Sequence, residues 1–186
     1  MIILGVDPGT LVTGYGLIET EKNNVTVLEF DVIINRNERS MPIRLREIYN
    51  RLCSVIEKYH PDEFAIETAF YGKNAQSALK IGHARGVSIL AAVNNEIPTS
   101  EYSPREVKKA VVGNGAASKD QVKYMVKSIL RIRETSKLFD ATDALAVALC
   151  HHHRRNGIKS NGKSHRSPQN WSSFVKENPG RVVRSR

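Results

Sequence analysis

Four carboxylates stand beside or within strongly apolar segments, where acidic side chains are uncommon. Asp7 and Glu67 each end a short apolar run, and Asp140 and Asp143 lie three residues apart at the start of an Ala- and Leu-rich segment. Acids embedded in such segments need a compensating cation. Four carboxylates can hold two Mg²⁺ ions roughly 3.5–4 Å apart, because Mg²⁺ prefers oxygen ligands. The set therefore predicts in-line hydrolysis of a phosphodiester, in which one ion activates a water and the other stabilises the leaving 3′-oxygen.

Each acid also has a simpler interpretation. Asp7 begins the sequence Asp-Pro-Gly-Thr, which is a common turn, and Asp140 at a helix start is commonly a cap. The Asp7 turn also resembles the phosphate loop of actin-like and sugar-kinase ATPases, which would mean phosphoryl transfer. Those ATPases need two lobes, and 186 residues are too few for both. The joint position of the four acids favours the metal site.

The elements that would position these acids follow from apolar periodicity and turn residues. Strands are predicted at residues 2–7, 13–18, 25–34, 64–67 and 99–102, and helices from Ser40, a possible N-cap, to Tyr59, at 75–95, at 104–112, from the Ser118 cap to about Arg131, and at 140–153. This order predicts an α/β fold, namely a mixed five-stranded sheet with helices on both faces. Asp7 and Glu67 would then end two strands, where the sites of α/β sheets collect. Asp140 and Asp143 would share one helix face.

Three histidines and two cysteines have metal-binding side chains but lack the spacing of a metal site. His151–His153 are consecutive, so on a helix their rings point about 100° apart and cannot converge on one ion. We interpret them as positive charge at the C-terminus of the last helix. Cys53 and Cys150 lie in apolar helical segments and are predicted to be reduced core thiols.

The net charge of +9 is spread unevenly along the chain. Residues 157–186 hold seven Lys or Arg and one Glu, and their Ser, Asn, Gly and Pro content predicts a basic, disordered tail after a domain at 1–156. Alternatively, Trp171 and Phe174 could dock this tail onto the body or a partner. The basic excess fits a polyanionic partner. No segment is long and apolar enough to span a membrane, and no basic leader precedes the first strand, which predicts a cytoplasmic protein.

Four groups of motifs stand out along the chain: Gly5–Thr10 with Gly14–Gly16, Ala65–Gly86, Glu101–Pro104 with Val107–Lys108 and Val111–Gly115, and Asp140–Ala146. Together these motifs resemble those of the RuvC family of Holliday junction resolvases. The central block of 22 residues matches almost residue for residue and is the most specific. The resemblance covers roughly residues 1–155. Thr142, where the motif more often has Ala, is a minor departure, and the extension past Gly157 is not covered.

The resemblance implies an RNase H-like fold, a homodimer and symmetric nicking of four-way junction DNA in recombination and repair. The family's catalytic acids fall on Asp7, Glu67, Asp140 and Asp143, which implies two Mg²⁺ ions per active site, with Mn²⁺ as a possible substitute. RuvA and RuvB, the branch-migration proteins, are implied as partners.

Four further residues are implied to contact DNA. Phe70 matches an aromatic that stacks on a splayed base, although it could instead be a core residue that anchors the turn. Lys73 would line the DNA groove, and Lys108 and Lys119 match basic residues near the scissile phosphate, whereas an exposed helical lysine is usually only solvated. Lys80 and Arg85 are weaker candidates for the groove.

Two other functions stay open from the sequence. One is a nuclease of the same fold that acts on an RNA–DNA hybrid or a transposon end, and the central motif argues against it. The other is a protein that binds junctions without cutting them, and the four intact acids argue against that.

Overall fold

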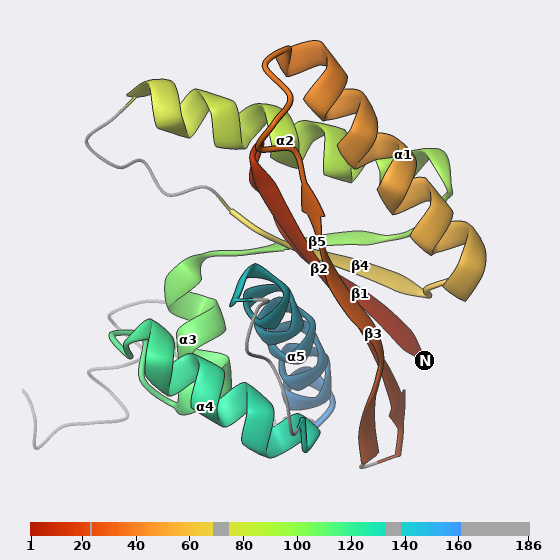
Figure 1. Ribbon diagram of the computed structural model, residues 1–186. Helices are drawn as coiled ribbons and strands as arrows, with labels where there is room; N and C mark the ends of the chain where they lie inside the picture. Colours follow the sequence, from red (N-terminus) through yellow and green to blue (C-terminus); the bar gives the residue numbers. More distant parts are fainter. Residues whose placement is uncertain (23, 69–74, 133–138, 161–186) are drawn as a thin grey trace, which may run out of the picture. The chain divides into compact units, whose positions relative to one another are not determined.

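Five strands form one mixed sheet with the order β3-β2-β1-β4-β5 (Figure 1). The strands are β1 (Ile2–Asp7), β2 (Val12–Glu21), β3 (Asn24–Ile34), β4 (Glu63–Glu67) and β5 (Thr99–Tyr102). β1 lies in the centre, antiparallel to β2 and parallel to β4, and its residues 3–6 are all buried. A strand covered on both faces is expected to be apolar throughout rather than alternating. This explains why the sequence of β1 is a continuous apolar run.

The computed structural model describes residues 1–22, 24–68, 75–132 and 139–160. Residues 1–155 form one unit, and residues 156–186 form a second, which is described only over 156–160. The predictions for Phe70, Lys73 and most of the basic tail therefore lie outside the described residues.

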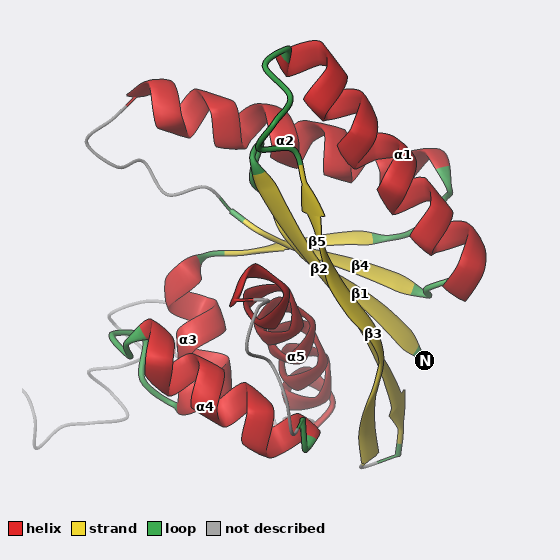
Figure 2. Ribbon diagram, in the orientation of Figure 1, coloured by secondary structure: helices red, strands yellow, loops and turns green. Residues whose placement is uncertain are grey.

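Helices cover both faces of the sheet, as predicted (Figures 1 and 2). One face carries α1 (Met41–Tyr59) and α2 (Ala75–Asn94), which pack against each other. The other face carries α3 (Pro104–Val112), α4 (Lys119–Leu130) and α5 (Phe139–Ser160). Within the described residues, no helix is both long and apolar enough to cross a bilayer.

Of the three helix starts whose N-caps the structure describes, two follow local capping chemistry and one does not. α3 and α4 begin with complete capping boxes, Ser103 with Glu106 and Ser118 with Gln121. The predicted cap at Ser118 is confirmed, since its side chain accepts from the Gln121 N–H. Ser40 occupies the N-cap position of α1 but makes no side-chain cap hydrogen bond. Pro42 in the first turn has no N–H, which reduces the number of donors that a cap must satisfy.

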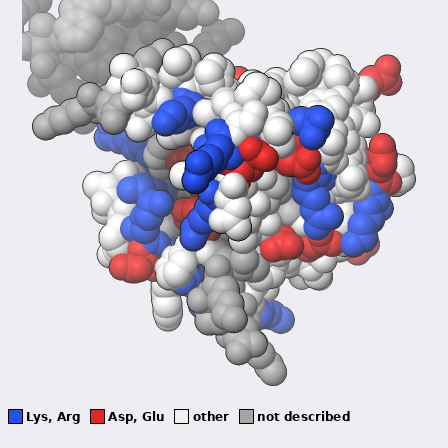
Figure 3. Space-filling view, turned by 45° about the horizontal axis from the view of Figure 1, so that its top comes forward, with Lys and Arg blue, Asp and Glu red and all other residues white. Residues whose placement is uncertain are grey.

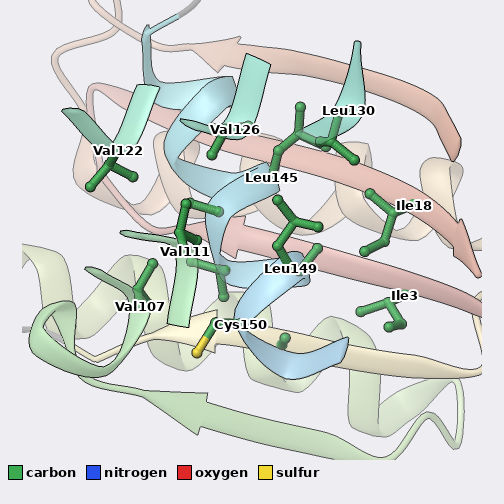
Figure 4. Close-up of a cluster of buried hydrophobic side chains, with 14 of the residues drawn as sticks. Ile3, Ile18, Val107, Val111, Val122, Val126, Leu130, Leu145, Leu149 and Cys150 are labelled. Carbon is green, nitrogen blue, oxygen red and sulfur yellow. The ribbon is translucent and has the colours of Figure 1, made fainter. Parts of the chain in front are cut away.

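The hydrophobic core has two halves, one on each side of the sheet. α5 lies across the face covered by α3 and α4, and Figure 4 shows its Leu145 and Leu149 packed against Ile3 and Ile18 of the sheet. The helix lies so close to β1 that a Cβ on Gly5 would be only 2.3 Å from the Ala144 carbonyl oxygen. Cys150 is buried in this half, Cys53 is half-buried, and both are free thiols.

The last helix is longer than predicted, because α5 continues to Ser160 rather than ending at His153. The extension is anchored by tertiary ion pairs from Arg154 to Glu106 and from Arg155 to Glu63. The interpretation of the three histidines as charge at the helix terminus is therefore wrong. They lie within the helix, and burial lowers the pKa of both His151 and His152, which favours neutral rings.

Candidate active site

Two neighbouring strands bring the first two acids together. β1 and β4 are parallel, with Val6 opposite Ile66, so Asp7 and Glu67 follow at the same end of the sheet. β2 runs antiparallel on the other side of β1, with Gly14 as the register partner of Asp7. The carboxyl end of the parallel pair is thus where both side chains lie, as the strand pattern predicts.

A glycine allows the first turn of α5 to reach this end of the sheet. A Cβ on Gly14 would lie 2.0 Å from the Asp140 carbonyl oxygen and 3.0 Å from the Ala141 nitrogen. Real Cβ atoms do not approach backbone so closely, so only glycine permits this contact. Because Gly14 pairs with Asp7, the same residue sets the helix start directly beside the first acid.

Three of the predicted acids form a compact ligand group. One carboxylate oxygen each from Asp7, Asp140 and Asp143 all lie within 4.8 Å of one another. Glu67 is outside this set but close enough for its charge to act on Asp7 and to respond to Asp143. Hard oxygen ligands that converge from β1 and α5 suit a divalent cation such as Mg²⁺ or Mn²⁺.

Without a cation, the acids disfavour one another's ionised forms. Burial, followed by the charges of Glu67, Asp143 and Asp140, raises the pKa of Asp7 from 3.8 to about 8. Burial and the Asp143 charge raise the pKa of Glu67 from 4.5 to about 7, and burial raises the pKa of Asp143. A bound divalent cation would reverse this balance by stabilising the carboxylates. The donor set therefore fits a metal site on both geometry and electrostatics.

Two lysines predicted to lie near the site contribute positive charge to it. The Nζ atom of Lys119 lies 3.4 Å from an Asp143 carboxylate oxygen, although the lysine side chain is 84% exposed. The charge of Lys108 lowers the pKa of both Glu67 and Asp143, in opposition to burial. Both lysines thus lie within electrostatic reach of the acids, on α3 and α4.

Two basic residues named as weaker candidates differ in their surroundings. Arg85 forms an ion pair with Glu101, so part of its charge is already neutralised. Lys80 is exposed on α2. The charge of the surface is mixed, and Figure 3 shows blue Lys and Arg side chains interspersed with red Asp and Glu on one face.

His151 and His153 contact different elements, and none of the three histidines belongs to the acidic group. The His151 ring contacts the Tyr102 hydroxyl at 2.8 Å through Nδ1 and Glu63 through Nε2. His153 donates from Nδ1 to the Ala110 carbonyl oxygen at 3.1 Å. This divergence follows from the helical spacing of consecutive residues.

Sequence reasoning missed two features of the site. The first is the role of Gly14, which the sequence places only within a motif. The second is the contact between Lys123 and Phe139, in which the Lys123 Nζ lies 3.4 Å from the ring centroid. The four-residue spacing of Lys119 and Lys123 is a visible signal for a shared helix face.

The chain is similar to a known protein family over most of its length. This family is described as Crossover junction endodeoxyribonuclease RuvC, and the match covers residues 3–151 of the chain. A protein of this description from Cytophaga hutchinsonii is 47% identical over 181 residues, covering 97% of this chain and 88% of the relative.

Solved structures agree with this match. A Thermus thermophilus RuvC structure is 31% identical, with a TM-score of 0.77 over 84% of this chain and 97% of that one. The T. thermophilus RuvC solved in complex with Holliday junction substrate is 30% identical, with a TM-score of 0.79 over 85% and 96%. The predicted RNase H-like α/β fold is confirmed by these matches.

Proposed function

Because this chain belongs to the crossover junction endodeoxyribonuclease RuvC family of nucleases, we propose that it resolves four-way DNA junctions by paired, symmetric nicks during recombination and repair. The observation that carries the proposal is the convergence of Asp7, Asp140 and Asp143 within 4.8 Å, with Glu67 in electrostatic contact. Such a set of acids fits phosphodiester hydrolysis supported by divalent cations.

We propose that the four acids hold two Mg²⁺ ions, with Mn²⁺ able to substitute. When bound, the ions supply a nucleophilic water and charge stabilisation at the leaving oxygen. The protein's contribution is to fix the acids on β1, β4 and α5, so that little rearrangement is needed when the substrate binds. Lys119, 3.4 Å from Asp143, can neutralise the phosphate as its negative charge develops, and Lys108 adds positive charge beside Glu67.

Other contacts are proposed from the family resemblance. Phe70 would stack on a base at the junction centre, and Lys73 would line the DNA groove. RuvA and RuvB would be partners in branch migration. We also propose the cytoplasm as the location, because the substrate is DNA undergoing recombination. The tail after residue 156 would add phosphate contacts through its basic residues.

A homodimer is proposed because two symmetric cuts across a junction call for two active sites related by a two-fold axis. α2 offers a suitable face. Its Leu79, Leu90 and Val93 are 62%, 49% and 54% exposed, and a Cβ on Gly82 or Gly86 would meet nothing within 4 Å. An apolar helix face with small residues can pack closely against its own copy.

The test is junction cleavage by four single variants, Asp7→Asn, Glu67→Gln, Asp140→Asn and Asp143→Asn. Each is expected to abolish Mg²⁺-dependent cutting, because each removes a charged ligand, while binding to the junction in Ca²⁺ survives through the phosphate contacts. Duplex DNA and an RNA–DNA hybrid are assayed beside the junction.

Asp120→Asn is the matched control, because Asp120 is an exposed acid at the start of α4. It is expected to cut normally. Near-normal cutting by two of the four variants would contradict the active-site assignment, and preferred cutting of the hybrid would contradict the proposed substrate.

A further inference from the structure

An exposed aromatic residue directly precedes one of the candidate metal ligands in the chain. Phe139, the residue before Asp140, begins α5 and is 59% exposed. The Lys123 Nζ lies over the ring, 3.4 Å from its centroid, which is close for a cation–π contact. A lysine on one face of the ring leaves the exposed part of the other face for a flat apolar partner.

The lysine belongs to a basic stripe that starts at the candidate active site. Lys119 contacts Asp143, and Lys123 and Lys127 follow at four-residue intervals, so the three share one face of α4. Successive lysines are about 6 Å apart along the helix axis. Long flexible side chains at this spacing can reach the phosphates of one DNA strand.

On the basis of the proposed function, we propose that Phe139 and Lys123 form a nucleotide-binding platform beside the scissile phosphate. A base of the cleaved strand stacks on the open face of Phe139, while Lys123 contacts the adjoining phosphate. The platform would hold the strand in position as it enters the acidic group, so Phe139 and Lys123 are positioning residues.

The charged surroundings of the ring and the stripe of lysines along α4 favour DNA, rather than a protein surface, as the ligand that binds there. Charged residues flank the ring, since the Lys123 Nζ lies over it and Asp140 follows it in the chain. A protein partner would need a wider apolar patch at this point. A base has a π face for the ring and a phosphate for the lysine.

The experiment uses the full chain with junction DNA that carries 2-aminopurine on either side of the scissile phosphate, in Ca²⁺ so that no cutting occurs. Phe139→Leu keeps apolar volume but removes the aromatic face. We expect it to change the fluorescence at one flanking position and leave a probe in a distant arm unchanged. In Mg²⁺, cleavage should fall about 5- to 150-fold, the range that base–aromatic stacking spans.

Lys123→Gln tests the phosphate contact separately. For this variant, the slope of log junction affinity against log salt concentration should be shallower than the wild-type slope by about 0.7–0.9. Arg46→Gln, which removes an exposed charge from α1, is the matched control and should not change the slope. Tyr124→Ala, which removes a 72% exposed ring one residue from Lys123, is the control for a general loss of aromatic surface.

The outcomes separate this platform from the proposed function. Wild-type protein that fails to cut junctions in Mg²⁺ would overturn both. Normal wild-type cutting with unchanged fluorescence and cutting in Phe139→Leu would overturn the platform alone. An equal loss of cleavage in Tyr124→Ala would also overturn the platform, because any exposed aromatic surface would then have the same effect. A loss of cleavage in Phe139→Leu that follows a fall in its melting temperature would overturn it too, because the ring would then act through folding.

Discussion

The buried carboxyl group of Asp7 destabilises the metal-free fold when it is ionised, but it can act as a ligand when a cation binds. Its carboxyl is drawn into the molecule by the buried strand β1, and it faces three other acids. Burial and these charges raise its pKa to about 8, so the metal-free protein holds a proton there at neutral pH. A cation therefore competes with that proton, and metal binding should strengthen as the pH rises.

The first prediction at this scale concerns stability against pH. The folded pKa of Asp7, about 8, exceeds its unfolded value of 3.8, so the folded state binds more protons between these values. Stability is thus greatest below about pH 4 for this group and is lost as the pH rises toward 8. Asp7→Asn removes the penalty and should stabilise the metal-free protein at pH 8 by on the order of 5 kcal/mol, since each pKa unit corresponds to about 1.4 kcal/mol.

Chemical unfolding in EDTA between pH 5.5 and 8 measures this difference. Glu67, whose pKa of about 7 has the same sign of shift, should add to the decline in the wild type. Added Mg²⁺ should stabilise the wild type at pH 8 much more than Asp7→Asn. A wild type that is as stable as the variant at pH 8 in EDTA would contradict the argument.

At the scale of elements, the site depends on the contact between a strand and a helix start. β2 carries Gly14 at the point where the backbone of Asp140 passes, and β1 carries Gly5 where Ala144 passes. The backbone of α5 therefore packs directly against two glycines on adjacent strands. Asp140 and Asp143 reach Asp7 only because this helix lies so close to the sheet.

Gly14→Ala is the prediction at this scale. Its Cβ would be 2.0 Å from the Asp140 carbonyl oxygen, so the start of α5 must shift or the strand must bend. We expect a loss of about 1–3 kcal/mol in unfolding free energy, typical of overpacking, together with weaker Mg²⁺ binding by calorimetry.

Gly157→Ala is the matched control, because this glycine lies within α5 and its Cβ would meet nothing within 4 Å. It should be neutral or stabilise by about 0.5–1 kcal/mol through helix propensity. If both alanine variants were equally stable and bound Mg²⁺ equally, the close approach at Gly14 would not be what positions the acids.

At the scale of the whole molecule, the proposed dimer predicts that α2 contains the subunit interface. Leu79→Glu inserts a charge into the exposed apolar face and should convert the protein from a dimer to a monomer at micromolar concentration, measured by sedimentation. Ile34→Glu is the control, because Ile34 is 64% exposed on β3, away from α2. A wild type that is monomeric both free and on junction DNA would count against the dimer.

The second whole-molecule prediction concerns the tail. Truncation after Ser160 keeps all of α5 and all four acids but removes six Lys or Arg and one Glu. Metal-dependent cutting should persist, while junction affinity falls and its salt dependence becomes shallower by about 0.9 for each duplex phosphate that the protein no longer neutralises. Affinities measured from low to high salt test this. A truncated protein with much lower thermal stability, or with an unchanged salt dependence, would contradict it.

The sequence alone predicted the order of the elements and the four candidate acids. Apolar periodicity and the Pro, Gly and Ser signals predicted β1, β5 and α3 with their observed bounds, and the strand ends carried Asp7 and Glu67. These signals are local, since each depends on a few neighbouring residues that favour one backbone conformation. The prediction of α5 went wrong at its end, because the helix continues through Arg154 and Arg155, whose partners Glu106 and Glu63 are distant in sequence.

Only the tertiary structure decided how the acids meet and what surrounds them. The 4.8 Å grouping of Asp7, Asp140 and Asp143 depends on α5 lying against Gly14, a contact across more than a hundred residues of chain. The raised pKa of Asp7 and the contact between Lys123 of α4 and the Phe139 ring of α5 also depend on tertiary packing. Burial and Coulomb interactions depend on distances in space, which spacing along the chain does not specify until the sheet and its helices have assembled.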